Sequence, residues 1–151
     1  MARIFFSVSG EGRGHAARAR TIVEALRDRH EFVLFSYGMA YDFLEAAYRG
    51  KSDVEVRRIP GLEFRYKAGR LDYFGSLVGA IPFALNQRTP VEELASALRR
   101  ERVDLVVTDF EPLLPRAAER CGVPYVSLDH QHFLVVNDLS SLPWALRWRA
   151  W

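Results

Sequence analysis

Segments of strand length, rich in apolar residues, alternate with segments of helical periodicity along almost the whole chain. Strands that are apolar throughout are expected in a parallel sheet covered on both faces, and the intervening helices supply those covers. Right-handed crossovers then favour a strand order near 3-2-1-4-5. The sequence therefore predicts an α/β fold, a Rossmann-like, doubly wound parallel sheet with helices on both faces.

The predicted elements are placed by their residue ranges. Strands are predicted at residues 3–8, 31–36, 54–59, 103–108 and 125–128. Helices are predicted at residues 15–28, 39–48, 71–86 with an interruption near Pro82, from 89 onward, and 112–120. Thr89 is the predicted N-cap of the fourth helix, with Pro90 in its first turn and Glu92 three residues after Thr89. Residues 61–70 are predicted to form a loop.

Composition limits the class of protein. The chain has 151 residues, 49% of them hydrophobic and 26% charged, with a formal net charge of +2. These values predict one globular domain over residues 1–151, without the polybasic surface that binds nucleic acid. The single cysteine, Cys121, cannot form an internal disulfide and fits a reducing compartment. No signal-peptide region and no apolar run of about 18 residues occurs, so we expect a soluble, cytoplasmic protein.

The last eleven residues have an unusual pattern. Residues 141–151 are predicted to form a helix with Trp144, Trp148 and Trp151 on one face. Such a face needs a packing partner, which predicts a further domain beyond residue 151. The alternative is an interfacial membrane helix that makes a peripheral membrane contact, with Arg147 and Arg149 near lipid phosphates.

Ligands of an open parallel sheet bind at the carboxyl ends of its strands, where the strand order reverses. Here those ends are the glycine-rich segment 9–15 and the acidic segment 109–112. In the predicted order the two segments face each other across the crevice. The glycine segment opens a helix, and its backbone N–H groups attract anions. Its glycine spacing departs from the dinucleotide fingerprint, residues 35–38 lack the acid of an NAD site, and the absence of Gly-Lys-Ser or Gly-Lys-Thr excludes a P-loop.

His15 and Asp109 are the candidate catalytic pair. His15 begins the first helix, where the helix dipole favours a neutral imidazole that can accept a proton from a hydroxyl. Asp109 ends the fourth strand and could accept the other imidazole N–H, which would hold the productive tautomer. The alternative is structural: His15 caps or packs, and Asp109 caps the helix that begins near Pro112.

The segment 129–132 follows the fifth strand at the same edge of the sheet. His130 and His132 could ligate a metal, but no further ligand cluster is visible, and no metal is expected. A polar wall of the same crevice, made by His130 and Gln131, and a solvated loop are the alternatives. His30 lies at the opposite edge and is predicted to be structural.

Four segments together resemble glycosyltransferases with two Rossmann-like domains, the GT-B architecture. They are residues 4–15 followed by Arg18, residues 28–33, residues 106–112 and residues 122–132. The chain is similar to family 1 and family 28 enzymes, and closest to the MurG-like proteins. The resemblance covers essentially the whole chain and implies that it forms the N-terminal half of such a fold.

The resemblance implies a function. In such enzymes the N-terminal domain binds the acceptor, and a C-terminal domain, absent from this chain, binds a UDP-, GDP- or dTDP-linked sugar. The nucleotide-sugar is a co-substrate, and no cofactor is implied. Transfer to an acceptor hydroxyl would be inverting and metal-independent, with His15 as base and Asp109 as its orienting partner. The chain alone is expected to be inactive. The residues expected to bind substrate are Gly10, Glu11, Gly12, Arg13, Gly14, Glu111, His130 and Gln131.

Other functions remain open. In the MurG-like branch the glycine segment approaches acceptor phosphate or donor, but Glu11 would repel a phosphate that Arg13 attracts. The chain could be a stand-alone acceptor-binding or anchoring module that recruits a separate donor-binding subunit, or a nucleotide-binding domain of another Rossmann type. The apolar segment 71–85 could line the acceptor site, touch a membrane-bound acceptor, or pack in the core.

Overall fold

A computed structural model describes residues 1–62, 66–67 and 70–128 of the chain. Its centre is a five-stranded sheet in which every pairing is parallel, in the order β3-β2-β1-β6-β7. The strands are β1 Arg3–Val8, β2 Glu31–Ser36, β3 Val54–Arg58, β6 Leu105–Asp109 and β7 Tyr125–Ser127. When the five strands of this sheet are numbered along the chain, their order is 3-2-1-4-5. The predicted fold class and strand order are therefore confirmed.

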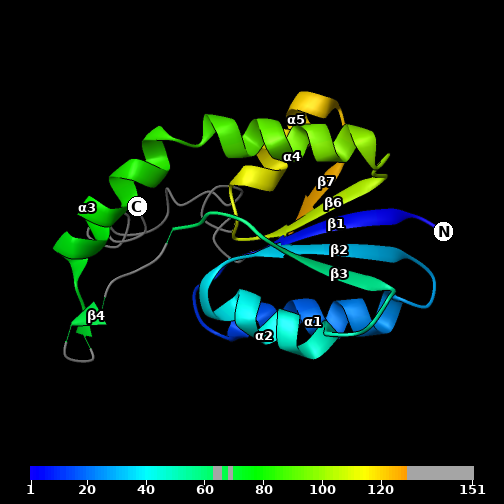
Figure 1. The fold of residues 1–151 in the computed structure, drawn as a ribbon, viewed down its shortest axis with the longest axis horizontal. Coiled ribbons are helices and arrows are strands. Elements are labelled where there is room, and N and C mark those ends of the chain that lie inside the picture. The colour runs from blue at the N-terminus through cyan, green and yellow to red at the C-terminus, as the bar shows by residue number, and fades with distance from the viewer. Residues whose placement is uncertain (63–65, 68–69, 129–151) are drawn as a thin grey trace, which may run out of the picture.

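Helices cover both faces of the sheet (Figure 1). They are α1 Gly14–Leu26, α2 Gly38–Tyr48, α3 Tyr73–Leu85, α4 Arg88–Arg100 and α5 Leu113–Cys121. α1 and α2 lie on one face and α4 and α5 on the other, whereas α3 extends away from the sheet beyond its carboxyl edge. This arrangement places the carboxyl ends of β1 and β6 between the two helical layers.

The core is divided into two layers by the alternation of side chains along β1. Phe6 packs with α1 and α2 in one cluster, and Phe5 packs with α4 and α5 in the other. Both phenyl rings are fully buried. Because successive side chains of a strand point to opposite faces, a strand covered on both sides must be apolar at consecutive positions. This is the physical reason for the pattern that predicted the fold.

Three local predictions were wrong. The predicted loop at 61–70 contains a short antiparallel pair, β4 Tyr66–Lys67 and β5 Arg70–Leu71. α3 runs without interruption through Pro82, which lies on its solvent side, where the chain tolerates the lost hydrogen bond. α4 begins at Arg88 after Gln87, without a side-chain cap, so Thr89 lies inside the first turn. Pro90 fits any position in the first turn of α4, because the N–H groups of a first turn have no partner within the helix.

The helix predicted at 141–151, with its three tryptophans, lies outside the described residues, and so do His130, Gln131 and His132. Within the described part of the chain, no helix is both long and apolar enough to cross a membrane. The apolar segment 71–85 divides in the structure. Phe83 of α3 packs against the core, whereas Val78, Ile81 and Leu85 are exposed.

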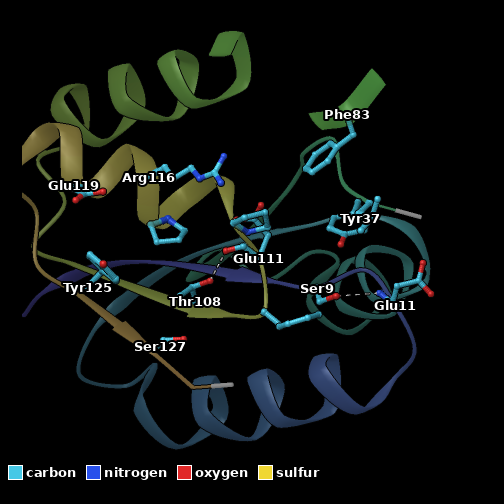
Figure 2. Close-up of a pocket in the computed structure, with 14 residues that line it drawn as sticks. Ser9, Glu11, Tyr37, Phe83, Thr108, Glu111, Arg116, Glu119, Tyr125 and Ser127 are labelled. Carbon is cyan, nitrogen blue, oxygen red and sulfur yellow. Dashed lines mark hydrogen bonds between the residues drawn. The ribbon is translucent and has the colours of Figure 1, made fainter. Parts of the chain in front are cut away.

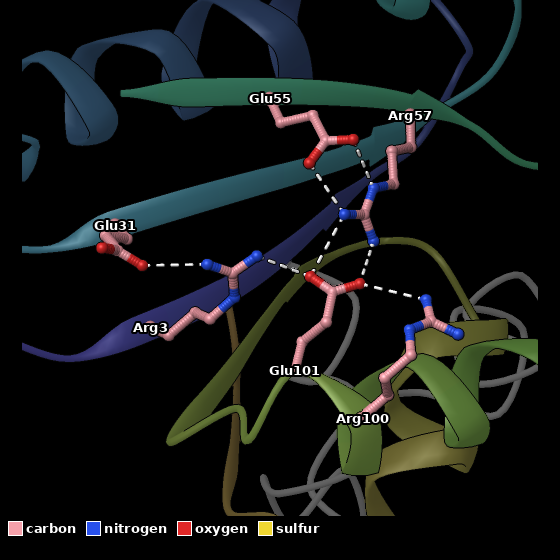
Figure 3. A network of polar contacts seen from close by, with 6 residues as sticks. All are labelled: Arg3, Glu31, Glu55, Arg57, Arg100 and Glu101. Atoms are coloured by element: carbon pink, nitrogen blue, oxygen red, sulfur yellow. Dashed lines mark hydrogen bonds and ion pairs between the residues drawn. The ribbon is translucent and has the colours of Figure 1, made fainter. Parts of the chain in front are cut away.

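An ion-pair network ties α4 to the sheet away from the carboxyl edge. It joins Arg3, Glu31, Glu55, Arg57, Arg100 and Glu101 (Figure 3). Glu101 is its centre, because its carboxylate accepts from Arg57 Nη1 and from Arg3 Nη2, both at 2.6 Å. Its side chain is 12% exposed. The hydrogen bond from Arg57, followed by that from Arg3, lowers the pKa of Glu101 to about 2.

Candidate functional site

The segments after β1 and β6 lie side by side at the carboxyl edge, as predicted. β1 and β6 are parallel neighbours in register from Ile4 opposite Leu105 to Val8 opposite Asp109. The N–H of Ser9 continues the ladder by donating to the carbonyl oxygen of Asp109 at 2.9 Å. The crevice at this edge therefore has the glycine segment on one side and the acidic segment on the other.

His15 and Asp109 are in contact. The distance from His15 Nδ1 to Asp109 Oδ1 is 2.8 Å, and the Asp109 side chain is completely buried whereas His15 is 25% exposed. Two acceptors would repel each other at this distance, so we assign the hydrogen to Nδ1, which donates to the carboxylate. Nε2 is then the acceptor of the ring. The geometry is that of a base held in one tautomer; the catalytic role of the pair stays a prediction.

Arg18 joins the pair, a role that sequence reasoning missed. Its Nε donates to Asp109 Oδ2 at 2.8 Å and its Nη2 donates to Asp109 Oδ1 at 2.5 Å, a two-point fork. Arg18 Nη2 also lies 3.2 Å from His15 Nδ1, but a protonated Nδ1 cannot accept, so this is proximity rather than a hydrogen bond. The available signal was spacing: Arg18 follows His15 by three residues on one helix face.

Glu111, not Asp109, caps the helix that follows β6. Glu111 Oε1 accepts from the N–H of Leu113 at 2.8 Å, and Oε2 accepts from the N–H of Leu114 at 3.0 Å. The structural alternative for Asp109 was therefore wrong. Burial raises the pKa of Glu111, against the effect of these two N–H donors. Its predicted contact with substrate stays a prediction beside this capping role.

The glycine segment is shaped by packing as well as by its turn. Tyr37 is buried, and its ring lies against Gly10 and Gly61, where any Cβ would overlap the ring. Gly12 has a φ of +75°, which a larger side chain rarely adopts, and Gly14 begins α1 with open space around it. Gly10 is thus required by Tyr37, which sequence reasoning did not single out.

A pocket of about 460 Å³ opens beside the pair (Figure 2). Ser9 and Glu11 from the glycine segment, the residues 110–112, α5, β7 and Phe83 of α3 line it. Figure 2 shows Tyr37, Phe83 and Tyr125 around it, with Glu111 between them. Neither His15 nor Asp109 lines this pocket. The pocket and the His15–Asp109 pair are therefore adjacent but separate.

Phe110 lies between the pocket and the His15–Asp109 pair. It lines the pocket, and its ring lies nearly parallel to the His15 ring, at an interplanar angle of 12° and a centroid distance of 6.1 Å. Its φ of +57° is in the left-handed region. No feature of the sequence indicated this position, because a phenylalanine after a strand carries no signal of left-handed backbone.

A metal centre is not visible among the described residues, where no three His, Cys, Asp or Glu side chains gather. His30 lies near the amino end of the sheet, and its Nδ1 accepts from the N–H of Ala2 at 3.3 Å, in keeping with the predicted structural role.

The parallel sheet and its order define the class of the domain as Rossmann-like and doubly wound. Residues 2–146 match the profile of the family described as "Glycosyl transferase family 1". The chain belongs to that family. A search of the curated proteins found no match.

Solved structures share the fold at low sequence identity. MurG of Acinetobacter baumannii is 14% identical, with a TM-score of 0.58 over 85% of this chain and 35% of that one. The calicheamicin glycosyltransferase CalG4 is 20% identical, with a TM-score of 0.54 over 85% and 32% of the two chains. A glycosyltransferase from Siraitia grosvenorii, solved with UDP, is 19% identical, with a TM-score of 0.56 over 94% and 32%.

The chain thus spans about a third of the length of these structures. At these identities the likeness shows the fold, and a fold hosts many chemistries. The fold alone therefore does not determine the reaction.

Proposed function

We propose that this chain is the acceptor-binding half of a glycosyltransferase, which transfers a sugar from a nucleotide-sugar to an acceptor hydroxyl with inversion and without a metal. The observation that carries the proposal is the contact between His15 Nδ1 and Asp109 Oδ1 at the open edge of the sheet. It leaves Nε2 as the acceptor of the ring, and Phe110 lies between the His15 ring and a pocket of about 460 Å³. Family membership supports the reaction class.

In the proposed reaction, His15 Nε2 takes the proton of the acceptor hydroxyl as the oxygen attacks the anomeric carbon. The bond from that carbon to the diphosphate oxygen breaks, and its electron pair leaves with the nucleoside diphosphate. Attack on the face opposite the leaving group inverts the anomeric carbon. The imidazolium that forms keeps its Nδ1 hydrogen bond to the Asp109 carboxylate, which compensates the new positive charge.

Arg18 modifies this charge balance. Neutral His15, Asp109 carboxylate and Arg18 guanidinium sum to zero before the reaction and to +1 after proton transfer. The fork from Arg18 fixes the carboxylate plane, so Oδ1 stays aimed at Nδ1. We propose that Arg18 is a positioning residue. Its charge weakens the electrostatic stabilisation of the imidazolium, but its two hydrogen bonds hold Asp109 in rigid alignment.

The donor site belongs, in this proposal, to a second domain or to a separate subunit. The negative diphosphate would leave near the glycine segment, where α1 begins and Arg13 is a cation. The second candidate is a stand-alone acceptor-binding module, favoured by the pocket, because residues of this chain line it.

The test uses the protein together with its donor-binding part, screened with UDP-, GDP- and dTDP-sugars while release of nucleoside diphosphate is followed. We expect His15→Ala to lower kcat by about 10²–10⁴ with little change in acceptor KM. His30→Ala is the matched control, because His30 lies away from the crevice, and it should keep full turnover. Turnover of His15→Ala within a few-fold of the parent would refute the base assignment. Acceptor binding without transfer from any donor would favour the module.

A further inference from the structure

α3 exposes a row of apolar side chains. Val78 and Ile81 are about half exposed, and Leu85 is 78% exposed. Their spacings of three and four residues place them on one face of the helix. Phe83 packs against the core from another face of the same helix. α3 is therefore apolar toward the core and also on the face that the described residues leave exposed.

The next helix shows what a solvent-facing surface of this chain looks like. The buried residues of α4 are all apolar, whereas its exposed residues include Arg88, Glu92, Glu93, Arg99 and Arg100. α3 has no charged residue along its whole length. A helix that is apolar on all sides is normally buried. The outer face of α3 thus needs a cover that the described part of the chain does not supply.

The sequence contains a segment that could form this cover. All three tryptophans of the chain, Trp144, Trp148 and Trp151, lie in the segment 133–151, and residues 133–136 are all apolar. The charged residues of the segment are Asp138, Arg147 and Arg149. Each tryptophan has a large apolar surface, so the segment is stabilised by contact with an apolar face.

The chain leaves the sheet at the edge from which α3 extends. The N–H of Leu128 donates to the carbonyl oxygen of Thr108 at 2.9 Å, at the carboxyl end of β6. α3 lies beyond that same edge (Figure 1). Residues 129–140 can span about 40 Å when extended, whereas a domain of this size has a radius of gyration of about 15 Å. The tryptophans can therefore reach α3 while the described fold stays as it is.

Two physical arguments favour this segment over another occupant. A segment of the same chain, joined by a short linker, meets its site at an effective concentration in the millimolar range, whereas a second copy must bind from solution. A membrane surface attracts an apolar helix face that is flanked by lysine or arginine. α3 itself carries neither.

We propose that the segment 133–151 packs, through its tryptophans, on the row formed by Val78, Ile81 and Leu85. α3 also brings Phe83 to the wall of the pocket (Figure 2), so this contact holds one wall of the pocket in place as well as covering the helix. The inference goes beyond the proposed reaction and does not depend on it.

Tryptophan fluorescence of the chain tests the proposal, because every tryptophan lies in the segment. In the parent chain we expect emission to the blue of free tryptophan and weak quenching by acrylamide. Leu85→Glu should weaken the packing about 10- to 100-fold, from the loss of one buried leucine, and should move emission to the red and increase quenching. Leu85→Met stays apolar and should keep the emission of the parent.

Met39→Glu is the matched control. Met39 is apolar and 55% exposed, and it belongs to α2, on the face of the sheet opposite α4. This variant should leave emission and quenching unchanged. The proposal is overturned if the parent chain emits like free tryptophan, if Leu85→Glu emits like the parent, or if Met39→Glu shows the same red shift.

The other occupants have their own signatures. With a second copy on α3, the parent emission would move to the red on dilution. With a membrane there, the emission would move to the blue only when vesicles of phosphatidylglycerol and phosphatidylcholine are added. Either result overturns the proposal. Circular dichroism checks the fold, and Ile81→Gln is the second polar variant, expected to shift emission as Leu85→Glu does. Loss of the helical signal in both variants would also overturn the proposal, because the row would then be part of the core.

Discussion

The cluster of His15, Arg18 and Asp109 allows a quantitative test of how its buried charge is held. Asp109 is fully buried, and its two carboxylate oxygens accept hydrogen bonds from both partners. Asp109→Asn keeps the shape but removes the charge, so the Arg18 guanidinium loses its two-point fork. Breaking a buried ion pair costs about 3–5 kcal/mol, but Arg18 is 31% exposed and water recovers part of this.

We therefore expect Asp109→Asn to lower the free energy of unfolding by about 2–3 kcal/mol and Tm by roughly 4–12 °C. Arg18→Met should cost about as much, because it leaves the Asp109 carboxylate with only the imidazole as partner. In the double variant both charges are absent, so the total should fall short of the sum by about 1.5–3 kcal/mol, the range for hydrogen bonds to charged groups.

Urea unfolding of the four proteins measures this coupling. The exposed pair of Arg88 and Glu92, with a nitrogen–oxygen distance of 3.0 Å, provides the comparison cycle. Water solvates both of its side chains, so it should show no measurable coupling. Additive effects in the Asp109 and Arg18 cycle would refute the reasoning, because the fork would then contribute nothing that water does not replace.

Two further predictions concern stability. The pKa of Glu101 is lowered by Arg57 to about 2 in the folded chain, so its stabilisation is complete above its usual pKa near 4.5 and is lost as pH falls from there to about 2. Urea unfolding should show Glu101→Gln about 2–3 kcal/mol less stable than the parent at pH 7, with the gap closing toward pH 2; a constant gap would contradict the assignment. Gly10→Ala should cost at least about 1–3 kcal/mol in the same assay, because its Cβ would overlap the Tyr37 ring and lie 2.5 Å from the Tyr37 carbonyl oxygen. Gly14→Ala, in open space at the start of α1, should be neutral or stabilising, and equal costs for both would refute the packing argument.

Much of the site could be predicted because it follows from topology. Once β1 and β6 are parallel neighbours, the residues at their carboxyl ends must meet at one edge, and His15 and Asp109 are a histidine and a carboxylate brought into contact there. The errors lie where local pattern competes with context. Thr89 fits the pattern of an N-cap, but α4 already begins one residue earlier, at Arg88. The N–H groups of a first helical turn need no partner within the helix, so no cap is required at Thr89.

The sequence by itself determined the layers of this protein. Apolar strand segments alternating with helical ones admit few arrangements, since each strand must be covered on both faces and each crossover is right-handed. The predicted order and the meeting of the two segments at the carboxyl edge followed from these constraints alone.

Only the tertiary structure decided which atoms meet within that edge. The fork of Arg18 on Asp109 joins residues 91 positions apart in the sequence. The cap that Glu111 supplies and the left-handed turn at Phe110 are local, but no sequence pattern indicated either. Hydrophobic periodicity fixes which face of an element is buried, but not how a polar side chain on an open edge is turned. That orientation is settled by which hydrogen bonds the folded neighbours leave available.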